Sequence, residues 1–223
     1  MTETAASAAL DSASDNDRSA YGFGLATIAT SDAGEATVLD VWFPAPALGE
    51  AAASLRAVEH ADESLTALAA ESHDADRRTE QKVVFAQINL DEAPADTVDA
   101  YLRLHLLSHR LVKPNSINLD GIFGKLPNVV WTNFGPAAVD GFELTRARLR
   151  KRGAVTVYGV DKFPRMVDYV VPTGVRIADA TGSAWAPTSP KAPRSCTRLR
   201  ELQRRHARHV HGGRAHLGRC CCR

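Results

Sequence analysis

The strong apolar runs and turn signals of this chain are concentrated between Tyr101 and Asp179, and the sequence after Ala180 is of a different kind. Residues 1–181 carry 17 Lys and Arg against 25 Asp and Glu, whereas residues 182–223 carry 10 against 1. The hydrophobic content of 44% is normal for a soluble globular protein. The chain therefore divides into an acidic body that can bury a core and a basic tail.

The sequence lacks the usual signs of secretion or membrane insertion. No apolar run approaches the length needed to cross a bilayer, and the N-terminus has neither the basic nor the apolar region of a secretory signal. All the cysteines lie in the tail, so the body has no disulfide framework: Cys196, Cys220, Cys221 and Cys222. These features predict a cytoplasmic protein without a membrane partner.

The first half of the body reads as a sheet. Residues 1–20 are too poor in large apolar groups to repay the entropy of ordering and are predicted to be a disordered leader. Residues 22–30 and 37–43 are β-rich and flank a turn cluster, which predicts a hairpin, and residues 81–90 should pair with it. Residues 45–80 have few large apolar anchors, so they predict a poorly anchored helix or a surface insertion.

The second half alternates helices and strands. Asp96 is a plausible N-cap of a helix that Pro114 would stop. Strands are predicted at residues 129–133 and 154–160, with a helix between them from Ala138 to Arg152 that ends at Gly153. The body, residues 21–166, is therefore predicted to be an α/β or α+β domain.

A six-residue rhythm follows the body. Val171-Pro-Thr-Gly-Val-Arg and Ile177-Ala-Asp-Ala-Thr place an aliphatic residue first in each unit, which is typical of a triangular parallel β-coil. Residues 167–181 are thus predicted to start such a coil. Fewer than two units are present, so an ordinary strand, turn and strand remains the alternative.

Two histidines stand four residues apart on the predicted helix. His105 and His109 share one face and resemble half of a zinc site, but a glutamate after the first histidine and a third ligand are missing. Tyr101, Leu102 and Leu106 lie on the same stripe. We therefore favour half-buried packing histidines over metal ligands.

Basic residues near the end of the body offer candidate contacts for anions. A cluster at the end of the second predicted helix could meet phosphates, although a solvated helix C-terminus explains it equally well: Arg146, Arg148, Arg150, Lys151 and Arg152. Lys162 and Arg165, in a charged turn, could hold a dicarboxylate or could simply snorkel from the turn. The glycines of this region predict turns rather than a phosphate-binding loop: Gly121, Gly124, Gly135 and Gly141.

The basic tail suggests a metal tract or a nucleic-acid contact. It combines three terminal cysteines with four histidines: His206, His209, His211 and His216. It has no Cys-x-x-Cys pair and no interleaved aromatic residues, so neither function is favoured.

The body also carries several long motifs in a fixed order. They are His105-Leu-Leu-Ser-His-Arg, Asn118-Leu-Asp-Gly-Ile-Phe-Gly, Asn128-Val-Val-Trp-Thr-Asn-Phe-Gly-Pro, Leu144-Thr-Arg-Ala-Arg-Leu and Val160-Asp-Lys-Phe-Pro-Arg-Met-Val-Asp-Tyr-Val-Val-Pro. Together they closely resemble the tetrahydrodipicolinate N-succinyltransferases, in the branch with an extended N-terminal domain. The resemblance covers about residues 21–180, apart from residues 45–80.

This resemblance implies a fold and an activity. The expected fold is an N-terminal α/β domain, a left-handed parallel β-helix of hexapeptide repeats and a C-terminal segment, assembled as a homotrimer. The expected reaction passes a succinyl group from succinyl-CoA to tetrahydrodipicolinate on the diaminopimelate route to lysine. Such enzymes use a catalytic glutamate and an adjacent arginine in a Met-Val-Glu-Gly-Arg segment of the β-helix, and an aspartate that binds Mg²⁺.

The tail does not continue the hexapeptide pattern, and two lost bases would explain why. With suitable codons, restoring one base in the codon of Ala180 and another just after Arg198 turns residues 180–223 into hexapeptide sequence. That sequence contains Met-Val-Glu-Gly-Arg, and the expected magnesium aspartate falls where Thr181 stands.

As written, the chain therefore has no catalytic glutamate, and we expect the β-helix to be cut short, the tail (182–223) to be disordered and the chain to be inactive. A non-catalytic oligomerisation or regulatory fragment is one alternative. A nucleic-acid binder with a basic tail is the other.

Overall fold

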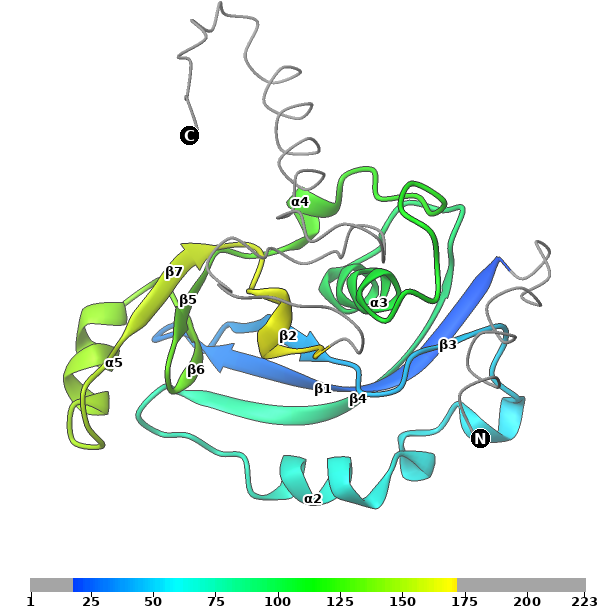
Figure 1. Ribbon diagram of the computed structural model, residues 1–223. Helices are drawn as coiled ribbons and strands as arrows, with labels where there is room; N and C mark the ends of the chain where they lie inside the picture. Colours follow the sequence, from blue (N-terminus) through cyan, green and yellow to red (C-terminus); the bar gives the residue numbers. More distant parts are fainter. Residues whose placement is uncertain (1–17, 172–223) are drawn as a thin grey trace, which may run out of the picture.

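Residues 18–171 are described by the structure, a computed structural model shown in Figure 1. The first sheet is built around the long strand β1 (Ser19–Thr30), which pairs antiparallel with β2 (Ala36–Trp42) and with β4 (Thr79–Asn89). The short β3 (Ala47–Leu48) pairs with the start of β1. The predicted hairpin and its pairing with the strand near residues 81–90 are confirmed. The first two residues of β1, Ser19 and Ala20, fall within the predicted leader.

Two glycines of β1 leave room for an aromatic ring. Phe43, which follows β2, is fully buried. A Cβ atom on Gly24 would lie 2.8 Å from this ring and 2.8 Å from Val41 Cγ1, and one on Gly22 would lie 3.2 Å from the ring. The Gly22-Phe-Gly24 sequence thus allows the strand backbone to approach Phe43 more closely than a side chain would permit.

Helix α3 (Thr97–Ser108) covers one face of this sheet (Figure 1). The carboxylate of Asp96 accepts a hydrogen bond from the backbone N–H of Asp99 at 2.9 Å, which confirms the predicted N-cap. The helix ends well before Pro114, because Arg110 adopts a left-handed conformation with φ 60° and the next N–H bonds back to the Leu106 carbonyl. The prediction that Pro114 stops the helix was wrong.

The interior of α3 contains a buried arginine. Residues 99–108 are all buried, so the helix is surrounded by protein rather than packed along one stripe. Arg103 is fully buried, with its Nε 2.6 Å from Asp99 Oδ1, and it donates to the carbonyls of Asn89 and Asn118 at 2.8 and 2.9 Å. This guanidinium joins α3 to the end of β4 and to the loop that follows α3.

The opposite face of the first sheet is covered less completely. After the 3₁₀ turns η1 (Ala53–Leu55) and η2 (Val58–His60), helix α2 (Glu63–Ala70) lies across this face (Figure 1). Of the eight residues of α2, all described, only Leu65 is buried. A poorly anchored helix is what the composition of this region predicts.

The second sheet has β5 (Val129–Thr132) at its centre, between β6 (Gly135–Ala138) and β7 (Val157–Asp161). Helix α5 (Phe142–Leu149) is shorter than the predicted helix at residues 138–152. Its start is delayed because Ala138 is taken up by pairing with β5, and Gly141 supplies a left-handed turn with φ 63°.

Every strand pair among the described residues is antiparallel, so the α+β form of the predicted mixed fold is the one observed. The short α4 (Ile122–Lys125) and the 3₁₀ turn η3 (Met166–Asp168) flank the second sheet in sequence. Residues 172–181 of the predicted coil, the tail and residues 1–17 lie outside the described residues. Within residues 18–171, no helix is long and apolar enough to cross a membrane.

The main core lies between the first sheet and α3 and extends to α4 and η3. Its largest buried side chains come from five parts of the chain: Val41, Phe43, Ile88, Leu90, Tyr101, Leu102, Leu104, Leu106, Ile122, Leu126, Phe163 and Met166. Smaller clusters connect it to the second sheet, for example Leu39 with Val129 and Trp131. The two sheets therefore share one continuous apolar interior.

Candidate functional site

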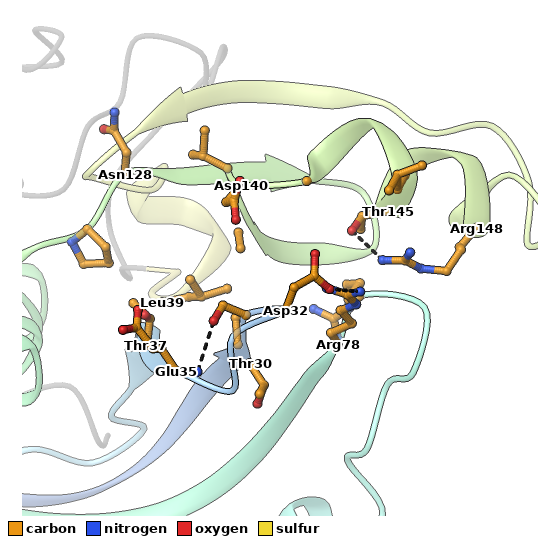
Figure 2. A pocket seen from close by; sticks show the side chains of 18 residues that line it. Thr30, Asp32, Glu35, Thr37, Leu39, Arg78, Asn128, Asp140, Thr145 and Arg148 are labelled. Carbon is orange, nitrogen blue, oxygen red and sulfur yellow. Dashed lines mark hydrogen bonds and ion pairs between the residues drawn. The ribbon is translucent and has the colours of Figure 1, made fainter.

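A cleft of about 290 Å³ separates the turn between β1 and β2 from the turn between β6 and α5 (Figure 2). Its floor is apolar, with Ala29, Leu39 and Ala138. Its rim is polar and is formed by Thr30, Ser31, Asp32, Glu35, Thr37, Arg77, Arg78, Asn128, Asp140, Thr145 and Arg148. A small polar molecule could enter this space.

The charges around the cleft are mostly paired within the protein. Arg78 forms an ion pair with Asp32, and the hydrogen bond from Arg78 lowers the pKa of that carboxyl. Arg148 donates to Thr145 Oγ1 at 2.8 Å and to the Asp76 carbonyl at 2.8 Å. The cleft therefore offers polar groups for binding but no nucleophile with an adjacent base.

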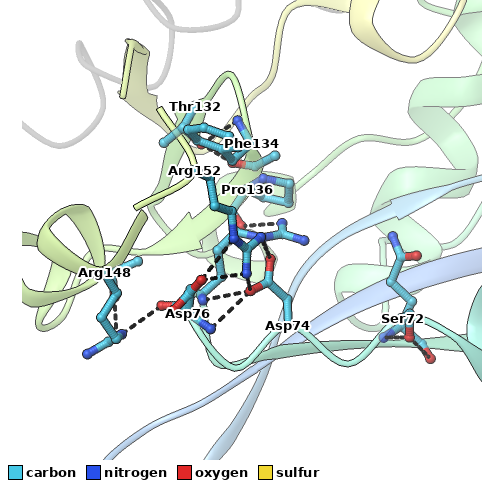
Figure 3. Close-up of polar contacts among 12 residues, drawn as sticks. Ser72, Asp74, Asp76, Thr132, Phe134, Pro136, Arg148 and Arg152 are labelled. Carbon is cyan, nitrogen blue, oxygen red and sulfur yellow. Dashed lines mark hydrogen bonds and ion pairs between the residues drawn. The ribbon is translucent and has the colours of Figure 1, made fainter. Parts of the chain in front are cut away.

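Beside this cleft, arginines clamp the two sheets together (Figure 3). Arg152 of the loop after α5 donates to both Asp74 oxygens at 2.7 and 2.9 Å and pairs with Asp76 at 2.7 Å. Arg77 donates to Asp74 at 2.7 Å and to the Pro136 carbonyl at 3.1 Å. Burial raises the pKa of Asp74, but the hydrogen bonds from Arg152 and Arg77 lower it more, so its pKa lies well below the ordinary value.

The predicted basic cluster is thus partly committed to internal contacts. Besides Arg148 and Arg152, Arg146 lies 3.2 Å from Glu143 and 5.0 Å from the centre of the Phe142 ring. Arg150 and Lys151 are exposed after the end of α5. A helix terminus explains this arrangement, and the phosphate contact stays a prediction.

Lys162 and Arg165, the predicted substrate-binding residues, lie apart from the cleft. The ammonium of Lys162 donates to the carbonyls of Phe123 and Leu126, the latter at 2.9 Å. Arg165 forms a two-fold hydrogen bond with Asp168 at 2.9 and 3.0 Å and stacks 3.9 Å from the centre of the Tyr158 ring. Both side chains therefore support the turn, and their predicted substrate contact stays a prediction.

Arg165 also lines a second hollow, of about 400 Å³, which is rich in aromatic side chains. Its lining residues include Asp40, Trp42, Trp131, Asn133, Tyr158, Arg165, Asp168 and Tyr169. The indole N–H groups of Trp42 and Trp131 both donate to backbone carbonyls, those of Tyr169 and Asp161. The aromatic groups of this hollow thus already serve the fold.

His105 packs in the core, as the favoured hypothesis predicts. It is fully buried, Nε2 accepts the Phe43 N–H at 3.1 Å, and Nδ1 donates to the Tyr101 carbonyl at 2.8 Å. Burial lowers its pKa to about 3, so the ring is neutral. His109 is exposed and stacks on His105 with ring centres 6.3 Å apart.

The predictions about metals fall partly beyond the described residues. Across residues 18–171, no three His, Cys, Asp or Glu side chains are grouped so that they could hold a metal ion. Thr181, where the family's magnesium aspartate is expected, and the cysteines and histidines of the tail lie outside this range.

Two pairs of interacting polar residues were not predicted from the sequence. The pair of Asp99 and Arg103, four residues apart on a predicted helix, was a signal that could have been found. The contact between Asp40 and Tyr169 joins residues 129 positions apart, so no local pattern could have indicated it.

Comparisons with known proteins agree with the order of these elements. Residues 58–124 match the family model described as tetrahydrodipicolinate N-succinyltransferase N-terminal, and residues 126–165 match the one described as tetrahydrodipicolinate N-succinyltransferase middle. The first match includes part of residues 45–80. The arginine clamp joins the N-terminal match to the middle match, and the cleft beside it is lined by both and by residues 29–39, which precede the first match.

Relatives with curated names carry the same description. The chain is 49% identical over 169 residues to the 2,3,4,5-tetrahydropyridine-2,6-dicarboxylate N-succinyltransferase of Salinispora tropica, covering 73% of this chain and 51% of the relative. It is also 49% identical over 129 residues to the protein of that name from Pseudomonas aeruginosa, covering 56% of this chain and 35% of the relative. The chain thus spans about half, or less, of the length of these relatives.

A solved structure supports the fold alone. A Campylobacter jejuni protein assigned as a 2,3,4,5-tetrahydropyridine-2-carboxylate N-succinyltransferase superimposes with a TM-score of 0.54 at 20% identity, over 80% of this chain and 56% of that one. Over residues 58–165, this chain thus resembles the N-terminal and middle domains of the tetrahydrodipicolinate N-succinyltransferase family.

Proposed function

We propose that this chain carries the front part of an acyltransferase that moves a succinyl group from succinyl-CoA to tetrahydrodipicolinate in diaminopimelate and lysine biosynthesis. The observation that supports this most strongly is the 49% identity over 169 residues to a relative with that name. By the same resemblance, the assembled enzyme is a homotrimer that uses succinyl-CoA as co-substrate and binds Mg²⁺.

The proposal extends to the loss of activity. Residues 182–223 contain no Met-Val-Glu-Gly-Arg segment, and Glu201 is their only acidic residue. Residues 182–223 therefore lack the glutamate that the resemblance assigns as base or acyl carrier at the transferred succinyl group. Thr181 also has no carboxylate to offer a hard cation such as Mg²⁺.

A succinyl-transfer assay tests both parts. The chain as written should release no CoA thiol from succinyl-CoA above background, whereas a product with both bases restored should turn over. Turnover by the chain as written would contradict the proposed loss of activity. A folded restored product that binds neither substrate would contradict the proposed reaction.

A second function is favoured by one structural observation. Residues 18–171 enclose a continuous core on their own, so they could persist as a folded, non-catalytic subunit that joins trimers of an intact copy. Co-expression with a tagged intact relative tests this: joint elution in size-exclusion chromatography is expected for a joining subunit, and separate elution would exclude it.

A further inference from the structure

Residues 162–171, here called the closing segment, are held to the rest of the protein mainly by side chains. The segment contains no strand, and its regular structure consists of the bridge residue Arg165 and the turn η3. At its start, the Lys162 ammonium donates to two carbonyls of the α4 region, and the Phe163 ring packs 5.1 Å from the Phe123 ring. Its other end needs a separate attachment.

Tyr169 provides this attachment. Its carbonyl accepts a hydrogen bond from Trp42 Nε1 at 3.1 Å, and its hydroxyl donates to Asp40 Oδ2. Its ring lies 6.0 to 6.4 Å from three other rings, those of Tyr101, His105 and Trp131. The Tyr169 side chain therefore contacts helix α3, β2 of the first sheet and β5 of the second sheet.

The Tyr169 hydroxyl contributes to stability because its acceptor, the Asp40 carboxyl, is buried. The carboxyl is 5% exposed, and its Oδ1 has no hydrogen-bond partner within the described part of the chain. Burial raises its pKa more than the neighbouring Thr27 and Tyr169 lower it. A buried carboxyl with so few donors depends on each of them, so the Tyr169 hydroxyl stabilises more than an exposed hydroxyl would.

We propose that Tyr169 and Asp40 form a latch that fixes the closing segment on β2 and so sets the point from which the chain continues into residues 172–181. Val170 is buried and Val171 is 84% exposed, so the chain leaves the core immediately after the latch. Tyr169 is then a positioning residue for whatever follows. Its relevance to a catalytic coil rests on the proposed function, but the latch itself does not.

Hydrogen exchange measured by mass spectrometry on the full chain tests the latch. Tyr169→Phe removes only the hydroxyl, and exchange in residues 162–171 should become about tenfold faster, as expected for the loss of one hydrogen bond to a buried acceptor. Exchange in residues 79–108, which include β4 and α3, should stay within about twofold of the parent. Tyr21→Phe, on β1, is the matched control and should change neither region.

A second variant distinguishes the loss of this hydrogen bond from general misfolding. Tyr169→Phe combined with Asp40→Asn removes the buried carboxyl together with its hydroxyl donor, and it should show the same local increase in exchange of residues 162–171. Unchanged exchange in residues 162–171 in both variants would overturn the latch. So would an equal rise in residues 79–108, because Tyr169 would then be an ordinary core residue. Neither result would contradict the proposed succinyl transfer, which is measured in a separate assay.

Discussion

At the scale of single residues, close packing explains why a glycine stands at position 24 in β1. The sequence shows this glycine only as part of a β-rich run. Gly24 lies under Phe43 and Val41 with no space for a side chain, whereas nothing lies within 4 Å of a Cβ built on Gly124 in α4. Gly24→Ala should therefore lower the free energy of unfolding by about 1–3 kcal/mol through overpacking.

Urea denaturation checks this, with Gly124→Ala as the control that should cost nothing or stabilise slightly. Equal stabilities for Gly24→Ala and the parent would show that the strand and Phe43 are less tightly packed than described.

His105 carries a prediction about pH. Its pKa is about 3 in the folded protein against 6.5 as the ordinary value, so the unfolded chain binds an extra proton between these pH values. The stabilisation from a neutral His105 is fully present above pH 6.5 and is lost as the pH falls toward 3. Between pH 8 and pH 5 the contribution should fall by about 2 kcal/mol.

Urea denaturation at the two pH values measures the change, and NMR of the imidazole identifies its source. The His105 ring should stay neutral from pH 8 to pH 5. A ring that titrates near pH 6.5 would contradict its burial.

At the scale of elements, the arginine clamp should hold the second sheet against the first. Asp74→Asn leaves Arg77 and Arg152 without their shared, 9% exposed carboxylate and should cost about 3 kcal/mol at pH 7. Because the folded pKa of Asp74 lies below 3.8, this contribution is present above that pH and declines as the pH falls below it.

Thermal denaturation of Asp74→Asn, Arg152→Gln and the double variant measures the coupling. The double variant should lose less stability than the sum of the two single losses, because the groups act together. Asp32→Asn, in the exposed ion pair with Arg78, is the matched control and should leave the midpoint unchanged. Strict additivity at Asp74 and Arg152 would mean that the clamp contributes nothing as a unit.

Local patterns predicted most elements because the signals are local. The β-rich runs around residues 22–43 and 81–90 gave the hairpin and its third strand, and Asp96 gave the start of α3. The early end of α3 at Arg110 depends on a left-handed backbone that a non-glycine residue rarely signals. The cleft and the clamp could not be predicted, since each brings together residues far apart in the sequence; the clamp, for example, joins Asp74 to Arg152 across 78 positions.

At the scale of the whole molecule, the main core spans both family matches, which divide at residue 125: Leu102 and Leu106 pack in it together with Phe163. The N-terminal and middle domains should therefore unfold together. Under the proposed function, the catalytic residues belong to a coil that follows residue 171, and residues 18–171 support that coil.

A chimera tests this central claim most directly. Residues 18–171 joined to the C-terminal half of the Salinispora tropica relative should restore succinyl transfer from succinyl-CoA to tetrahydrodipicolinate, while the chain as written shows none. A chimera that folds, by circular dichroism and cooperative unfolding, yet shows no transfer would contradict the account, because a genuine front part should support the coil of its 49% identical relative.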